Sequence, residues 1–246
     1  MGTWKKVILL ALITIPAAAQ DAAMVNPQIV KVEFENDKVR VLRALYKPHD
    51  RLEMHSHPAK AEVQITGGTV RIFAADRKWQ DAPGKAGEFF WLEPTKHAVE
   101  NVGDASVELV EIEMKNVSAP SRPVAASEHA AAKDATEPVP VQLEPHHRWI
   151  FENQYVRVLD VVLAPVELTL FHTHSHDSIA VRLTDSKVQE QPAGGEWRPA
   201  SRVQPGDSRY MEGTNKPYTH RIKNVSSTPF HVVDIELLGE NEPRKP

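Results

Sequence analysis

The chain has 246 residues, of which 41% are hydrophobic and 25% charged, and its formal net charge is −4. This balance is typical of a soluble globular protein and offers no basic stripe for a phosphate backbone, which argues against nucleic acid as a partner. Cysteine is absent, which excludes disulfides, thiolate metal ligands and a lipoprotein anchor.

Residues 1–19 predict a cleaved signal peptide. Two lysines precede an apolar run at residues 7–15, and three alanines at residues 17–19 form a small-residue cleavage frame before Gln20. The run is too short to span a bilayer, which needs about 20 apolar residues. We therefore expect a periplasmic or secreted protein without a membrane anchor.

The remainder of the chain has the pattern of a duplicated unit. Residues 34–42 (FENDKVRVL) reappear as residues 151–159 (FENQYVRVL), 117 positions later. The offset grows to 123 further along, and it grows only in places that are typical of loops. Two diverged copies of one fold behave in this way, so we predict two domains at residues 28–115 and 147–239.

Within each copy the pattern is that of β-strands. Apolar and polar residues alternate at residues 39–41, 70–72 and 107–109, and turn-forming clusters such as 66–68 and 101–104 separate them. Many short strands with frequent turns predict an all-β sandwich or barrel.

Residues 116–146 separate the two copies. Their prolines predict a linker without a long helix or a paired strand, with one helical turn near Ala130.

Each copy carries a histidine pair and a later lone histidine. The first copy has His55 and His57 followed by His97, and the second has His172 and His174 followed by His220. A strand sends alternate side chains to the same face, so the two members of a pair, about 7 Å apart at Cα, can converge on one ion. The lone histidine must come from another strand.

Glu62 follows the first histidine pair. On an unbroken strand its side chain would point to the face opposite that of His55 and His57. The intervening residues 58–60 begin with a proline and allow a bend, which would turn Glu62 inward.

The order of these residues resembles the two consecutive motifs of the cupin superfamily, which place a histidine pair, a glutamate, a glycine, a proline, a histidine and an asparagine in sequence. The matching residues are His55, His57, Glu62, Gly87, Pro94, His97 and Asn101. The resemblance covers nearly all of the first copy. It implies a small jelly-roll β-barrel and, because the unit is repeated, a bicupin of two tandem barrels joined by a Pro/Ala-rich linker.

The resemblance also implies a divalent metal in the mouth of the first barrel, with His55, His57, Glu62 and His97 as its ligands. Three imidazoles and one carboxylate suit Mn, Fe, Ni, Cu or Zn, and they leave positions open for water or substrate.

The second copy lacks the acid, because Ala180 or Ile179 stands where the first copy has Glu62. Three readings stay open: a site of His172, His174 and His220 alone, a replacement carboxylate from Asp177, or loss of metal binding. We expect the first site, which has a carboxylate, to hold a divalent ion more tightly than the second.

His176 is a further candidate ligand, since strict alternation puts it on the face of the second pair. On a straight strand its Cα lies about 13 Å from that of His172, too far for easy shared ligation. The remaining histidines fall outside the motifs and are expected at the surface; they are His49, His129, His146, His147 and His231.

These observations favour an exported, metal-dependent bicupin that acts on a small molecule at a His3Glu metal site. Oxygenase, decarboxylase, isomerase and lyase chemistry all stay open, because the fold does not decide function. Whether the protein is an enzyme is itself left open, since the pattern identifies no catalytic acid or base outside the ligand set. The alternative is a non-catalytic bicupin binding module for a sugar, an organic acid or a metal. A homo-oligomer is compatible with both.

Overall fold

The computed structural model describes residues 20–117, 119–122, 124, 132 and 135–239. The predicted signal peptide, the helical turn near Ala130 and His129 lie outside the described residues.

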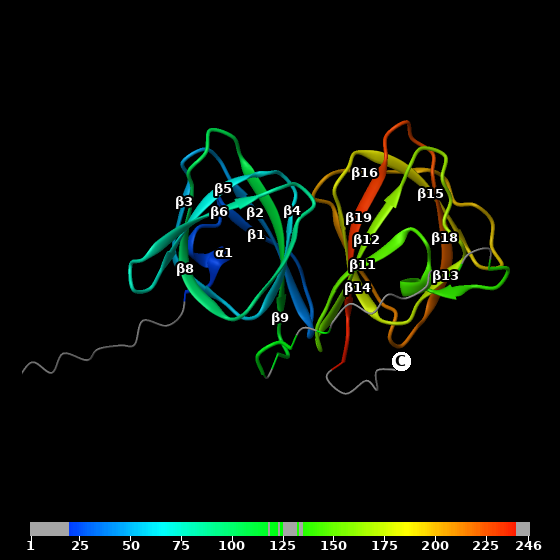
Figure 1. Cartoon of the computed structure of the whole chain (residues 1–246), viewed down its shortest axis with the longest axis horizontal. Helices are drawn as coiled ribbons and strands as arrows, with labels where there is room; N and C mark the ends of the chain where they lie inside the picture. Colours follow the sequence, from blue (N-terminus) through cyan, green and yellow to red (C-terminus); the bar gives the residue numbers. More distant parts are fainter. Residues whose placement is uncertain (1–19, 118, 123, 125–131, 133–134, 240–246) are drawn as a thin grey trace, which may run out of the picture.

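The described residues form two β-barrels that lie side by side (Figure 1). Each barrel is built from two antiparallel sheets in jelly-roll fashion, which confirms the predicted all-β fold. Among the described residues, no helix has the length and apolar character needed to cross a membrane.

The N-terminal barrel has one sheet in the order β1-β2-β9-β4-β7 and another in the order β3-β8-β5-β6. Its elements are the helix α1 (Ala22–Val25) and the strands β1 (Val30–Glu35), β2 (Val39–Tyr46), β3 (Arg51–His57), β4 (Lys60–Gln64), β5 (Gly68–Ala74), β6 (Trp79–Gly84), β7 (Phe89–Leu92), β8 (Thr95–Asn101) and β9 (Val107–Met114). Leu42 and Leu109 of the first sheet pack with Leu52 and Val99 of the second, so the core of this barrel lies between its sheets.

The C-terminal barrel repeats this plan with the orders β11-β12-β19-β14-β17 and β10-β13-β18-β15-β16. Its elements are β10 (Val139–Pro140), the 3-10 turn η1 (Val141–Leu143), β11 (His147–Glu152), β12 (Val156–Leu163), β13 (His172–His174), β14 (Asp177–Arg182), β15 (Ser186–Pro192), β16 (Ser201–Val203), β17 (Ser208–Met211), β18 (Tyr218–Asn224) and β19 (Phe230–Leu237).

The two barrels share a hydrophobic core across their five-stranded sheets. Val39 and Val41 of β2 pack in the same buried cluster as Val156 and Val158 of β12. Side chains alternate along a strand, so Leu42, which follows Val41, points to the other face and lies in the core of its own barrel. Both faces of these sheets are therefore buried, which explains why their strands are rich in apolar residues on both sides.

The strand registers align the two copies residue by residue. Glu62 pairs with Glu111 in the N-terminal barrel, and Ala180 pairs with Asp234 at the corresponding place in the C-terminal barrel. Ala180, rather than Ile179, is therefore the counterpart of Glu62.

The repeated asparagine and glycine outside the histidine set shape turns. The side-chain amides of Asn101 and Asn224 donate to the carbonyl oxygens of Ala105 and Thr228, each at 2.8 Å. Gly206 has a φ of +83°, a backbone conformation that residues with a Cβ rarely adopt. These repeated positions are explained by the fold.

The prediction that the linker forms no paired strand is wrong at its C-terminal end. Val139 and Pro140 form β10, which pairs in parallel with His172 and Thr173 of β13. A proline is tolerated there because β10 is an edge strand, where a missing N–H need not break a ladder on both sides.

Candidate metal centres

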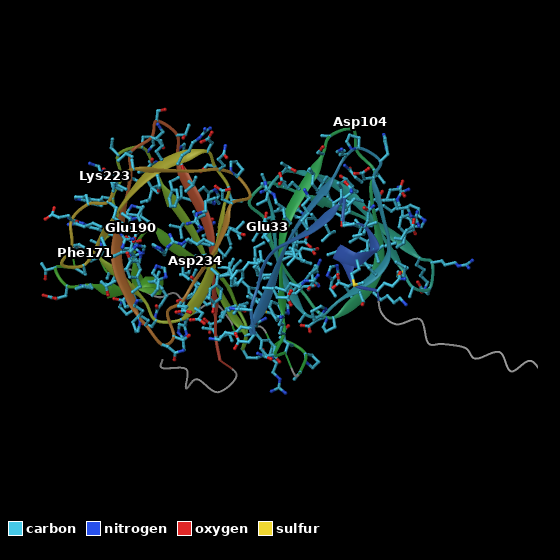
Figure 2. All side chains as sticks on the ribbon, turned by 180° about the vertical axis from the view of Figure 1, so that it is seen from behind. Glu33, Asp104, Phe171, Glu190, Lys223 and Asp234 are labelled. Carbon is cyan, nitrogen blue, oxygen red and sulfur yellow. The ribbon has the colours of Figure 1, made fainter. Side chains whose placement is uncertain are left out.

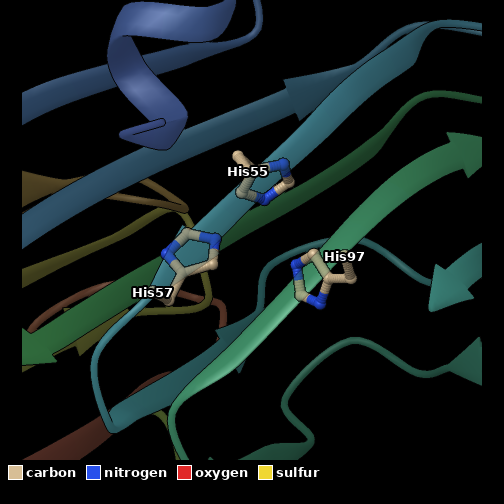
Figure 3. Close-up of side chains that lie close together, drawn as sticks. All are labelled: His55, His57 and His97. Atoms are coloured by element: carbon tan, nitrogen blue, oxygen red, sulfur yellow. The ribbon is translucent and has the colours of Figure 1, made fainter. Parts of the chain in front are cut away.

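Three histidines of the N-terminal barrel converge as predicted (Figure 3). His55 and His57 come from β3, and His97 lies on the neighbouring strand β8, directly opposite His55. All three are buried, and each offers a ring nitrogen within 4.8 Å of the others. Burial lowers the pKa of His55 to about 4 and that of His97 to about 3, so both rings are neutral at pH 7 and have a free lone pair.

The Nδ1 atoms of the histidine pair meet acceptors on the side away from this meeting point. His55 Nδ1 lies 2.7 Å from the carbonyl oxygen of Glu53, and His57 Nδ1 lies 2.6 Å from the carboxylate of Glu113. A proton held on each Nδ1 leaves Nε2 as the ligand atom. Nε2 of His55 is buried without a hydrogen-bond partner, and such an orphaned lone pair fits a metal ion.

Glu62 faces the interior of the barrel, as the predicted bend requires, because β3 ends at His57 and β4 begins at Lys60 in the other sheet. Its carboxylate lies 3.2 Å from Nζ of Lys60, which also bonds the buried Glu111. The structure does not bring Glu62 into the histidine group. The ammonium of Lys60 holds this carboxylate instead, and ligation by Glu62 stays a prediction.

The second histidine pair and its partner also converge. His172 and His174 of β13 lie opposite β18, where His220 pairs with His172. The Nε2 atoms of His174 and His220 are 3.2 Å apart, and the rings of His172 and His220 are 4.6 Å apart between centroids. Burial lowers the pKa of His172 and His174 well below the usual value.

A fourth histidine, His147, joins this group, and its predicted surface position is wrong. Its ring is buried, and its ligand atom lies within 4.8 Å of those of His172 and His174. The ring centroid of His147 lies 4.6 Å from that of His172. His147 begins β11, and in the register of the repeat its counterpart is Val30, a buried residue of β1.

A signal for His147 was present in the sequence. The aligned position of the other copy carries an apolar residue, so a histidine there had to face inward. His147 lies next to the linker and outside the histidine motifs, so the motifs alone do not identify it as a ligand.

Each of these four rings has an acceptor near Nδ1. Two are hydrogen-bonded: His147 to Glu144 at 2.6 Å, and His172 to the carbonyl oxygen of Leu170 at 2.9 Å. The other two face carboxylates at longer range, His220 with Glu190 at 3.5 Å and His174 with Asp234 at 3.6 Å. Burial by itself would raise the pKa of Glu144, but the interactions with His147, His146 and the Leu170 amide together outweigh it and bring this pKa to about 2. Acceptors of this kind fix the tautomer of a ligating histidine.

The two further candidate ligands lie outside the groups found among the described residues. Asp177 bonds the ammonium of Lys38 across the two barrels and accepts hydrogen bonds from the Tyr210 hydroxyl at 2.5 Å and from two backbone amides. A carboxylate so fully engaged holds the interface together. His176 is half-buried on the bend between β13 and β14.

We expect Asp177→Asn to destabilise the protein and to leave its metal content unchanged. The substitution removes the charge that pairs with Lys38, and hydrogen bonds to charged groups contribute about 1.5–3 kcal/mol. Urea denaturation would measure the loss, and elemental analysis the metal. A fall in bound metal at unchanged stability would instead identify Asp177 as a ligand.

The metal-free protein is expected to lose stability as the pH falls from about 6.5 towards 4. In that range an unfolded histidine takes up a proton, whereas buried His55 and His97 do not, because their pKa values are about 4 and about 3. The unfolded state then binds more protons, so the free energy of unfolding decreases with falling pH. Thermal melts of chelator-treated protein would record this, and His97→Asn should flatten the profile. An equally steep profile in that variant would assign the effect to other groups.

A cavity of about 1170 Å³ adjoins the four-histidine group. His147, His172, His174 and His220 line it, together with Ala180, Arg182, Glu190, Tyr218 and Asp234. Figure 2 places Glu190 and Asp234 within the C-terminal barrel, and Glu33 on the side of the N-terminal barrel that faces it. Glu33 also lines the cavity.

No protein-family model and no curated protein matches the chain, but solved structures do. AerE from Microcystis aeruginosa has a TM-score of 0.61 at 14% identity, over 86% of this chain and 94% of AerE. Oxalate decarboxylase from Bacillus subtilis has a TM-score of 0.53 at 12% identity, over 85% of this chain and 71% of the other. A cupin 2 conserved barrel domain protein from Leptotrichia buccalis has a TM-score of 0.48 at 11% identity, over 85% and 88%.

The likeness to AerE and to oxalate decarboxylase, at 14% and 12% identity, concerns the fold. The chain therefore has the cupin fold, in two tandem barrels. Each barrel contains a histidine group that could hold a metal ion.

Proposed function

We propose that the protein is a metal-dependent enzyme acting on a small molecule, and that its active centre lies in the C-terminal barrel. The observation that carries this proposal is a group of buried imidazoles at the edge of the 1170 Å³ cavity. The ligand atoms of His147, His172 and His174 lie within 4.8 Å of one another, and Nε2 of His220 lies 3.2 Å from that of His174. A metal ion held there would be reachable from the space in which a small molecule fits.

The comparison of matched positions supports this choice of barrel. His147 stands where the N-terminal barrel has Val30, and Glu190 of β15 stands where it has Ile72 of β5. Both counterparts belong to the packed apolar cluster of the N-terminal barrel. In the C-terminal barrel, core-filling residues have thus been replaced by groups that bind metal or position its ligands.

This proposal reverses the ranking expected from the sequence. The first site was favoured for its carboxylate, but Lys60 holds Glu62. The second site gains a ligand from His147. Four imidazoles suit the same range of ions, Mn, Fe, Ni, Cu or Zn, and a resident ion would supply Lewis-acid or redox chemistry.

The residues around the histidines can bind and orient a substrate. The Tyr218 hydroxyl donates to Glu190, and burial together with this bond raises the pKa of Tyr218 to about 12. Tyr218 therefore keeps its proton at neutral pH, and its hydroxyl oxygen can accept a hydrogen bond in the cavity. Oxygenase, decarboxylase, isomerase and lyase reactions all fit such a site.

Metal analysis of protein recovered from its own exported fraction tests the proposal, combined with water-proton relaxation after loading with Mn²⁺. Bound metal with exchangeable water, lost in a His172→Ala variant, supports an enzyme centred on the C-terminal barrel. Metal without water exchange supports the alternative, a non-catalytic binding module.

We also propose that the protein is exported and acts in the periplasm or outside the cell, on the evidence of residues 1–19. The mature chain is expected to begin at Gln20. N-terminal sequencing or intact mass of the protein from the native host would check this, and recovery of soluble protein that retains Met1 would contradict it.

A further inference from the structure

Arg182 is a largely buried cation that forms no ion pair among the described residues. It ends β14, and its guanidinium makes one side-chain hydrogen bond among the described residues, from Nη1 to the carbonyl oxygen of Ala180 at 2.6 Å. Its Nε is buried with no hydrogen-bond partner. A buried charge that is not paired is costly, so a cation retained in this state calls for a ligand.

The side chain of Arg182 faces the cavity of the four-histidine group. Ile179 and Val181 of the same strand lie in the core between the barrels, and the alternate residues Ala180 and Arg182 point into the C-terminal barrel and line the cavity. Asp234 lies opposite Ala180 on β19 and lines the same space.

Among the described residues, none of the acids that line the cavity forms an ion pair or a hydrogen bond with the guanidinium of Arg182, although Asp234 and Asp207 lie near enough to act on its charge. Glu190 pairs with Arg198 at 3.0 Å and accepts from Tyr218. Asp234 faces Nδ1 of His174 at 3.6 Å. The charge of Arg182 therefore stays available.

The positive charge at this position is present in the C-terminal barrel and not in the N-terminal barrel. In the N-terminal barrel the position of Arg182 is taken by Gln64, which pairs with Leu109 as Arg182 pairs with Val232. The replacement of a neutral amide by a guanidinium accompanies the appearance of His147 and Glu190, the other two groups that distinguish the cavity.

We propose that Arg182 anchors a carboxylate of the substrate, which makes the substrate class of the four-histidine centre a small carboxylic acid. This inference rests on the proposed function. Four neutral imidazoles leave the two positive charges of a divalent ion uncompensated, so the ion and Arg182 would attract the same anion from two sides. A carboxylate has two oxygens in one plane, which suits the planar fork of a single guanidinium.

The test uses the full mature chain, first freed of metal with chelator and then reloaded, with succinate and inorganic phosphate as probes in calorimetry and thermal melts. Succinate is expected to bind the wild-type protein. Arg182→Gln introduces the residue found at this position in the other barrel. This substitution should weaken succinate binding about 10- to 100-fold, which corresponds to the loss of a hydrogen bond to a charged group. Arg202→Gln is the matched control, because that exposed arginine pairs with Asp185 on the same barrel.

A second measurement separates an anchor from a structural residue. Without ligand, Arg182→Gln should melt at the same or a higher temperature than the wild type, because it removes an uncompensated buried charge. A lower melting temperature with unchanged succinate affinity would overturn the proposal, and tighter binding of phosphate than of succinate would overturn the substrate class. If the C-terminal barrel holds no metal but succinate binding still depends on Arg182, the result would support Arg182 as a carboxylate anchor and contradict the proposed metal centre.

Discussion

His147→Ala is expected to lower the affinity of the C-terminal barrel for a divalent metal by at least about 100-fold. The substitution deletes one of the three imidazoles whose ligand atoms lie within 4.8 Å of one another. Loss of a group that merely orients a ligand already costs about 10- to 100-fold, so loss of the ligand itself should cost at least as much. Competition with a fluorescent chelator would measure the affinity, in a chain whose first site is disabled by His97→Ala.

His146→Ala is the matched control for this variant. His146 is the neighbouring histidine and also contacts Glu144, at 3.1 Å, but it does not line the cavity. It should leave the affinity close to that of the parent chain. If His172→Ala abolishes binding and His147→Ala does not, the centre has three histidines and His147 serves only in packing.

Lys60→Met is expected to destabilise the metal-free protein by about 3–5 kcal/mol, the cost of breaking a buried ion pair by removing one partner. Lys60 is one of the largest fully buried side chains, and its ammonium forms ion pairs with both Glu62 and Glu111. Methionine has a similar length and no charge, so it would leave both carboxylates buried without a cation. Urea denaturation in the presence of chelator would measure this loss.

The same variant tests whether Glu62 can bind metal. Once Lys60 no longer holds it, Glu62 is free to turn towards His55, His57 and His97. In a chain whose second site is disabled by His172→Ala, added Zn²⁺ or Mn²⁺ should therefore restore part of the lost stability through binding to the folded state. Lys78→Met is the control, because Lys78 is 85% exposed and pairs with Asp76 on the surface; it should change stability by less than about 1 kcal/mol. A destabilised Lys60→Met protein that gains nothing from metal would remove Glu62 from the ligand set.

If both results hold, the two barrels have diverged in role. The N-terminal barrel fills its interior with an ion cluster around Lys60, whereas the C-terminal barrel keeps a cavity beside its histidines. The shared core between the five-stranded sheets then makes the first barrel a structural support for the second.

The amino-acid sequence by itself determined the repeat, the all-β fold and six of the histidines in the two groups. These features are local: alternation along a strand, two histidines with one residue between them, and a constant offset between copies can be recognised without knowing which strands are neighbours.

Only the tertiary structure decided which polar groups meet. Lys60 and Glu111 are 51 residues apart in the sequence, and their contact depends on the pairing of β4 with β9. His147 reaches its group because β11 enters the C-terminal barrel with its first residue facing inward. Among the described residues, Arg182 forms no ion pair because of what surrounds it in space. The charge balance inside a barrel depends on contacts between strands distant in sequence, and no local pattern encodes those contacts.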